Sequence, residues 1–114
     1  MTEIDHTKSR SVRLTGKQRK RFRQIAHHLQ PVVTVAEKGL SEAVINETQR
    51  ALKDHELIKV KLNIADRHAR MNLGTELAQH THSDIVQTIG KIIVLYRENP
   101  SADASLSNVS RYQD

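Results

Sequence analysis

The chain has 114 residues, a length that supports one domain with a single hydrophobic core. It carries 18 Lys and Arg residues against 13 Asp and Glu, a net charge of +5, and it contains no cysteine, which excludes disulfides, thiol catalysis and cysteine-based zinc sites. Phe22, Tyr96 and Tyr112 are its only Phe, Tyr or Trp residues, too few for a sheet that recognises RNA by stacking bases on an aromatic platform.

The two ends of the chain predict flexible tails. Residues 1–13 and 99–114 are polar, rich in Ser, Thr and Asn, and without apolar periodicity, so the folded domain is expected over residues 14–98. Met1–Arg10 lacks the apolar core of a secretion signal, and the longest apolar run, Ile92–Tyr96, is too short to cross a bilayer. We therefore expect a cytoplasmic protein.

The positive charge is concentrated near the N-terminus. The segment Lys8–Gln30 holds eight basic residues and no acid, whereas the other 10 basic and 13 acidic residues sum to −3. Such a segment is typical of a surface that binds a polyanion, most often nucleic acid, although a solvated helix face can have the same composition.

A first helix is expected from Thr15, because Gln18 three residues later completes a capping box. Its apolar side chains recur with helical spacing and predict a buried stripe. The stripe consists of Phe22, Ile25, Ala26 and Leu29. The basic ridge on the other side of the helix consists of Lys17 and Lys20, with Arg21 and Arg23 at its flanks. Arg19 lies nearer the apolar stripe, where its stem can pack.

Strands and helices then alternate. The segment Leu57–Ile64 alternates apolar residues with Lys59 and Lys61, which predicts a strand with one buried and one basic face. The other expected elements are a strand over 32–35, a helix capped by Ser41, a helix from Asp66 to about His80 that buries Met71 or Leu73, and two strands over 84–89 and 92–97 joined at Gly90-Lys91.

The resulting order, α-β-α-β-α-β-β, predicts the α/β class. The economical arrangement is a compact single domain in which helices pack on a four-stranded mixed sheet. The last strand is apolar on both faces and is therefore expected in the interior of the sheet.

Four separated blocks of the sequence resemble the CRM domain, named for chloroplast RNA splicing and ribosome maturation, in its single-domain bacterial YhbY form. They occur in the family's order and spacing, and together they span nearly all of the folded part. The blocks are Leu14-Thr15-Gly16-Lys17-Gln18, Ala26-His27 with Pro31-Val32-Val33, His55-Glu56-Leu57-Ile58-Lys59-Val60-Lys61, and Ile89-Gly90-Lys91 with Val94-Leu95-Tyr96-Arg97.

The resemblance implies a fold similar to the C-terminal domain of translation initiation factor 3, RNA binding, and association with precursors of the large ribosomal subunit. It also implies a Gly-x-x-Gly loop that approaches the RNA backbone. Here the loop maps onto Ala36-Glu37-Lys38-Gly39, with alanine at the first glycine position and an acid inside. Lys38 and Gly39 are carried over as RNA contacts, while Ala36 departs from the pattern.

The candidate RNA-binding residues come from the basic ridge, the loop and the later strands. Lys59 and Lys61 have an equally good explanation as charges that keep an exposed sheet solvated, and Tyr96 is expected in the core. The full set is Lys17, Lys20, Arg21, Arg23, Lys38, Gly39, Lys59, Lys61 and Arg97.

No catalytic residue, metal or cofactor is expected. His27-His28 and His80-x-His82 lack the spacing and the companion carboxylate of a helical zinc site. Asp54-His55-Glu56 has no identifiable nucleophile nearby, and local hydrogen bonding explains it.

We therefore expect a monomeric RNA-binding protein that acts in assembly of the large ribosomal subunit, with no membrane or small-molecule partner. An alternative from another class is a basic protein-interaction module that docks an acidic partner and binds RNA incidentally. A third reading, a small hydrolase that uses His55 and Glu56, has no support from the sequence.

Overall fold

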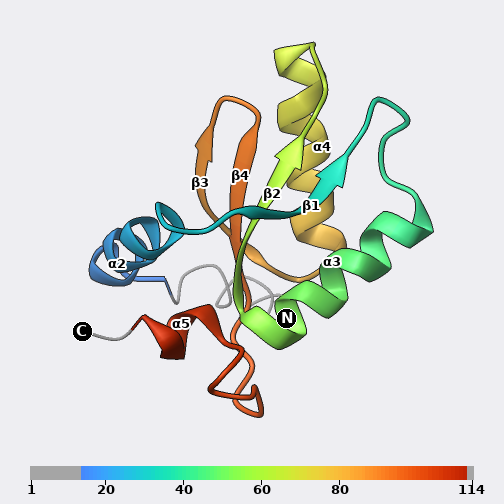
Figure 1. The fold of residues 1–114 in the computed structure, drawn as a ribbon. Helices are drawn as coiled ribbons and strands as arrows, with labels where there is room; N and C mark the ends of the chain where they lie inside the picture. Colours follow the sequence, from blue (N-terminus) through green and yellow to red (C-terminus); the bar gives the residue numbers. More distant parts are fainter. Residues whose placement is uncertain (1–13, 113–114) are drawn as a thin grey trace, which may run out of the picture.

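The computed structural model describes residues 14–112, so the tail predicted over residues 1–13 lies outside the described part of the chain. Helices lie on both faces of a four-stranded sheet (Figure 1), and the predicted element order is confirmed, with one short helix added after the last strand. The elements are α2 (Gly16–Ala26), β1 (Pro31–Val35), α3 (Glu42–His55), β2 (Leu57–Leu62), α4 (Arg67–His80), β3 (Asp84–Ile89), β4 (Ile92–Tyr96) and α5 (Asn108–Arg111).

The sheet is mixed, as predicted, with the strand order β1-β2-β4-β3. β1 runs parallel to β2 across the α3 connection, and β4 pairs antiparallel with both β2 and β3. β4 is therefore an interior strand, which confirms the prediction from its apolar sequence. Its three central residues are buried because side chains on both faces of the sheet are covered.

The two faces of the sheet have separate cores. On one face, α3 and α4 cover alternate residues of β1, β2 and β4, with Leu52 and Leu77 fully buried beneath them. On the other face, Phe22 and Ile25 of α2 pack against Leu57 and Val94. The ring centroids of Phe22 and Tyr96 lie 4.4 Å apart, so Tyr96 belongs to this second core, as expected.

The three long helices begin where their capping residues predict. Thr15 and Gln18 form the reciprocal capping box, with Gln18 N donating to Thr15 Oγ1 at 3.0 Å and Thr15 N donating to Gln18 Oε1 at 2.9 Å. Ser41 and Asp66 accept hydrogen bonds from backbone N–H groups three residues later. These caps satisfy donors that the first turn of a helix leaves unpaired.

The C-terminal segment differs from its prediction. Residues 99–112 were expected to be a flexible tail, but they pack against the domain and contain α5. Glu56 holds this segment: its Oε1 accepts from Ser107 Oγ and its Oε2 from Asn99 N, both at 2.6 Å. Asn108 Nδ2 donates to Leu57 O at 2.7 Å. The partners lie more than 40 residues apart in sequence, which explains why local pattern did not reveal them.

Of the two alternatives for the buried face of α4, Leu73 is half-buried and Met71 is 52% exposed. Gly74 lets α4 approach the sheet closely, because a Cβ at this position would lie only 3.0 Å from Ile93 Cδ1. Within residues 14–112, no helix has the length and apolar character needed to span a membrane.

Candidate nucleic-acid interface

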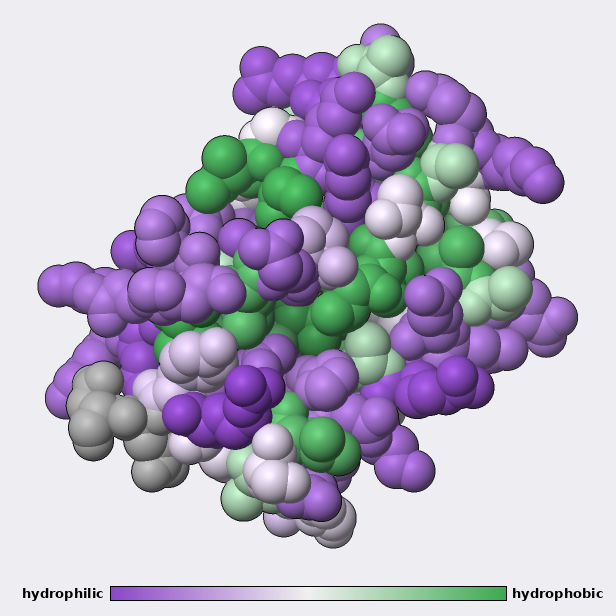
Figure 2. Space-filling model, viewed as in Figure 1, coloured by the Kyte–Doolittle hydropathy of each residue, from purple (hydrophilic) through white to green (hydrophobic). Residues whose placement is uncertain are grey.

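The basic ridge of α2 faces solvent. Burial of Phe22 and Ile25 fixes the orientation of the helix, which leaves Lys17 and Lys20 exposed and Arg23 half-buried. Figure 2 shows hydrophilic side chains covering the α2 region on the left of the molecule. Lys17, Lys20 and Arg23 therefore present positive charge and make no side-chain hydrogen bond within residues 14–112.

Two other arginines of α2 instead bind backbone groups of the domain. Arg19 Nη1 donates to Ile85 O at 2.9 Å and to Val86 O at 3.0 Å, at the bulge in β3. Arg21 Nη2 donates to Val109 O at 3.1 Å, and its guanidinium carbon lies 5.9 Å from the centroid of the Phe22 ring. Arg21, expected to contact RNA, thus ties α2 to the C-terminal segment, while its charge still contributes to the local potential.

The face of the sheet beside α2 is partly open. Lys59 is half-buried and Lys61 is exposed on this face, opposite Ile92 in the neighbouring strand. Arg23 and Lys59 line the same pocket, at the boundary between α2 and the sheet. The structure therefore brings two predicted residues from distant parts of the sequence to one place. Ile89, which is exposed, also lines this pocket.

The loop between β1 and α3 forms a tight turn. Gly39 N donates to Ala36 O at 2.9 Å, and Gly39 has a φ of +90°, which favours glycine. Ala36 has a negative φ, so the backbone does not require glycine at that position. Glu37 Oε2 accepts from Ala65 N at 3.0 Å, and Lys38 is exposed. The acid inside the loop therefore braces it against the segment that precedes α4.

The loop and the ridge lie at opposite ends of β1 (Figure 1). A strand of five residues spans roughly 17 Å. The predicted single surface is thus two basic groups, with Lys59 and Lys61 on the neighbouring strand between them.

The two loop positions should differ in how strongly they tolerate substitution. Gly39→Ala places a Cβ at positive φ and should reduce the free energy of unfolding by about 1–2 kcal/mol. Ala36→Gly should leave the loop conformation and RNA affinity unchanged and cost at most about 1 kcal/mol, through the entropy of the unfolded chain. Urea unfolding and RNA titration of both variants measure these effects. Tighter RNA binding by Ala36→Gly would show that alanine impairs the loop.

Arg97 is engaged inside the domain. Its Nη1 donates to Gln49 Oε1 and, at 2.8 Å, to Thr81 O, while Nη2 donates to Gln49 O at 3.2 Å. These bonds connect β4 with α3 and with the end of α4. Arg97, a predicted RNA contact, is thereby placed in a structural position.

The residues of the third reading also have structural partners. The Glu56 carboxylate binds Ser107 and Asn99, and His55 Nδ1 lies 2.8 Å from Leu106 O. Among residues 14–112, no group of three or more His, Cys, Asp or Glu side chains is placed to hold a metal ion.

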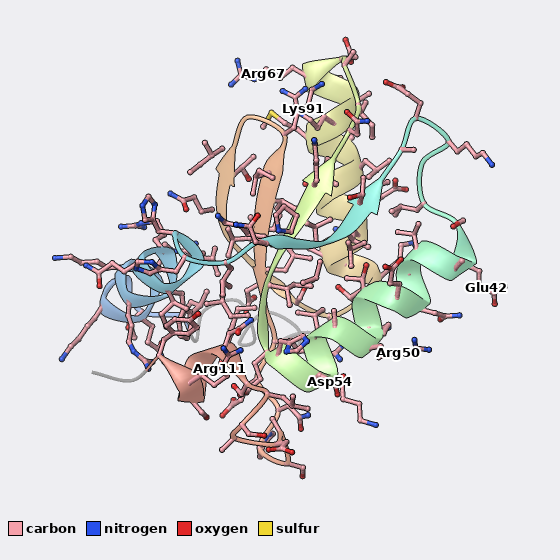
Figure 3. All side chains as sticks on the ribbon, viewed as in Figure 1. Glu42, Arg50, Asp54, Arg67, Lys91 and Arg111 are labelled. Carbon is pink, nitrogen blue, oxygen red and sulfur yellow. The ribbon has the colours of Figure 1, made fainter. Side chains whose placement is uncertain are left out.

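Lys91 and Arg67 are exposed basic residues that the predicted site omits. Figure 3 shows both at the same end of the sheet, beyond the β3–β4 turn. Lys91 O accepts from Leu62 N at 2.7 Å, which fixes the turn beside β2.

The fold is a small α/β domain in which Arg23 of α2 and Lys59 of β2 meet beside one face of a mixed sheet. The sequence matches the CRS1 / YhbY (CRM) domain over residues 14–97, and the chain belongs to this family.

Relatives match over most of their own length. A probable RNA-binding protein of Pseudomonas aeruginosa is 54% identical over 99 residues, which cover 87% of this chain and 95% of the relative. An RNA-binding protein of Haemophilus influenzae is 44% identical over 93 residues, which cover 82% and 92%. The solution structure of a candidate RNA-binding protein from Staphylococcus aureus is similar, with a TM-score of 0.69, 34% identity, and coverage of 78% of this chain and 93% of that one.

Proposed function

We propose that the protein binds structured RNA through its cationic surface and acts as an assembly factor for the large ribosomal subunit. The observation that carries RNA binding is the continuity between Arg23 on α2 and Lys59 on β2, which line one pocket. The relatives named as RNA-binding proteins support the same function. The assembly role rests on the family resemblance.

The proposed contact residues follow from which side chains are available. Arg21 and Arg97 are left out as direct contacts because their guanidinium groups bind internal acceptors. Gly39 is proposed to shape the loop beside Lys38. The proposed phosphate contacts are Lys17, Lys20, Arg23, Lys38, Lys59 and Lys61.

The mechanism is non-covalent. Lysine and arginine side chains neutralise phosphates and release condensed counterions, so binding requires no reacting group in the protein. Lys38 lies before the N-terminus of α3, where backbone N–H groups and the helix dipole also favour an anion. Bound in this way, the protein favours one fold of the RNA or excludes a premature partner.

A salt titration tests the electrostatic mechanism. If about five of the six proposed side chains engage phosphates, the logarithm of the affinity should fall with the logarithm of the salt concentration at a slope of about −3.5 to −4.5. Fluorescence anisotropy with a labelled structured RNA measures this slope. A slope near zero would overturn the mechanism.

The protein-interaction alternative makes a different prediction in the same assay. A surface made for an acidic protein should bind heparin, duplex DNA and RNA with similar weak affinity, because only charge density is recognised. A preference for structured ribosomal RNA over heparin therefore separates the two functions.

Sedimentation of cell extract through a sucrose gradient tests the assembly role. Co-migration with a large-subunit precursor, lost in a variant with reversed charges at Lys17, Lys20 and Arg23, is the expected result. Brief crosslinking before lysis retains transient complexes. Recovery only at the top of the gradient after crosslinking would contradict the assembly role while leaving RNA binding open to the titration.

A further inference from the structure

Two rings face each other where the end of α2 meets the C-terminal segment. The imidazole of His28 and the phenol ring of Tyr112 have centroids 6.3 Å apart and planes inclined by only 7°. Both rings line one pocket of about 190 Å³, together with Gln24 and Arg21. The chain has few aromatic residues, so this parallel pair at the surface is unusual within it.

We propose that this pocket binds one unpaired nucleobase of the RNA, stacked between His28 and Tyr112; this inference rests on the proposed RNA binding. We name it the base pocket. Such a site supplies recognition of a single-stranded or bulged nucleotide, which the phosphate contacts of the basic ridge cannot provide.

A base can stack between the two rings once they move apart. Stacked bases lie about 3.4 Å apart, so a base between two parallel rings needs ring planes separated by about 6.8 Å. For nearly parallel rings the centroid distance of 6.3 Å is an upper limit on the separation of the planes, so the gap must widen before a base can enter. His28 is exposed and Tyr112 is half-buried, so rotation of these surface side chains can open the gap.

The pocket also offers polar groups to the edge of a base. The exposed Gln24 side chain makes no hydrogen bond in the described part of the chain, and its amide carries both donors and an acceptor. Such a group can pair with the donor and acceptor pattern of a nucleobase edge. Arg21 acts as a positioning residue, because its bond to Val109 O holds the segment that carries Tyr112.

Charge beside the pocket identifies nucleic acid as the occupant. A second hollow on α2 shares Gln24 and His28 with the base pocket, and Lys20 and Arg23 also line it. A base held between the rings therefore places its phosphates next to the basic ridge. A neutral aromatic ligand would gain nothing from these cations.

Stacking can be measured separately from charge. Tyr112→Ala and His28→Ala should each lower the affinity for a short oligoadenylate by about 5- to 150-fold, the range expected for loss of one stacked base. Neither variant removes a phosphate contact, so the salt slope and the affinity for a fully paired RNA duplex should stay unchanged. Tyr112→Phe is the matched control, because it retains the ring and should bind as the unmodified protein does.

Tyrosine fluorescence gives a second readout. The chain has no Trp, and Tyr96 packs against Phe22, so quenching by oligoadenylate should come from Tyr112 and disappear in Tyr112→Phe. If Tyr112→Ala unfolds, His28→Ala still tests the stack, because His28 is an exposed residue in the turn after α2.

The outcomes distinguish this inference from the proposed function. Unchanged oligoadenylate affinity in both alanine variants, or an equal loss for oligoadenylate and duplex, would overturn the base pocket while RNA binding stands. If the unmodified protein shows no salt-dependent binding to either RNA, the proposed function fails and the base pocket fails with it.

Discussion

Reversing the charges of Lys17, Lys20 and Arg23 to glutamate should weaken RNA binding at least a hundredfold at roughly 0.1 M salt. Loss of three phosphate contacts reduces the magnitude of the salt slope by about 2.1 to 2.7. If the two proteins bind equally well at about 1 M salt, this difference in slope makes the variant at least about a hundredfold weaker at roughly 0.1 M salt. Repulsion by the new carboxylates adds to the loss. Anisotropy titrations across a salt series measure both quantities.

The three ridge side chains make no internal hydrogen bond within residues 14–112, so the variant should retain its circular dichroism spectrum and its midpoint of urea unfolding. A matched control reverses Arg50, Lys53 and Arg67, three exposed residues on α3 and α4, the helices that pack on the face of the sheet not covered by α2. Both triple variants have the same net charge. Equal weakening in the control would mean that overall charge, rather than the ridge, determines affinity.

Replacement of Glu56 by alanine should reduce the free energy of unfolding by about 2–5 kcal/mol. The side chain is 8% exposed and accepts two hydrogen bonds of 2.6 Å, from Ser107 Oγ and Asn99 N. Its removal leaves these donors without a partner, and each unsatisfied buried group costs about 1–3 kcal/mol. Urea unfolding followed by circular dichroism measures the change.

A double-mutant cycle that combines Glu56→Ala with Ser107→Ala shows how much of the lost stability comes from the hydrogen bond between these two residues. Because Ser107 is fully buried and bonded to Glu56, the two substitutions should be non-additive by at least about 0.5 kcal/mol. Glu56→Gln keeps the size of the side chain and should be less destabilising than alanine. Additive effects would place the stabilising role of Glu56 elsewhere.

Local signals predicted the helices and strands well. The capping box at Thr15, the caps at Ser41 and Asp66, and the alternation around Lys59 depend on residues a few positions apart, and each is present in the structure. The interior position of β4 followed from its apolar run because a strand covered on both faces has no place for polar side chains.

The role of individual arginines could not be predicted in this way. Arg21 and Arg97 carry the same charge as Arg23, but their guanidinium groups bind carbonyl oxygens that are 88 and 16 residues away in sequence. Helical periodicity gives the direction of a side chain and not the long-range partner at its tip. Arg19 was correctly expected near the apolar stripe, since its position on the helix turns it toward the sheet.

The C-terminal segment shows the same limitation, because its hydrogen-bond partners also lie far away in the sequence. α5 has only four residues, too few for a periodic pattern, and its stability comes from Glu56, Leu57 and Arg21 far earlier in the chain. A polar, Ser-rich composition is therefore compatible with a flexible tail and also with a segment that specific hydrogen bonds hold in place. The base pocket was missed for this reason, because Tyr112 lies in that segment.

The contact between Arg19 and β3 has a consequence for the solubility of the fold. β3 is an edge strand, and the exposed backbone of an edge strand can pair with a strand from another molecule. Two of its carbonyl oxygens, at Ile85 and Val86, already accept from Arg19, and the bulge between Ile85 and Gln87 interrupts the regular ladder there. We therefore expect Arg19 to hinder edge-to-edge pairing at β3, while Lys17 and Lys20 on the same helix stay exposed to solvent.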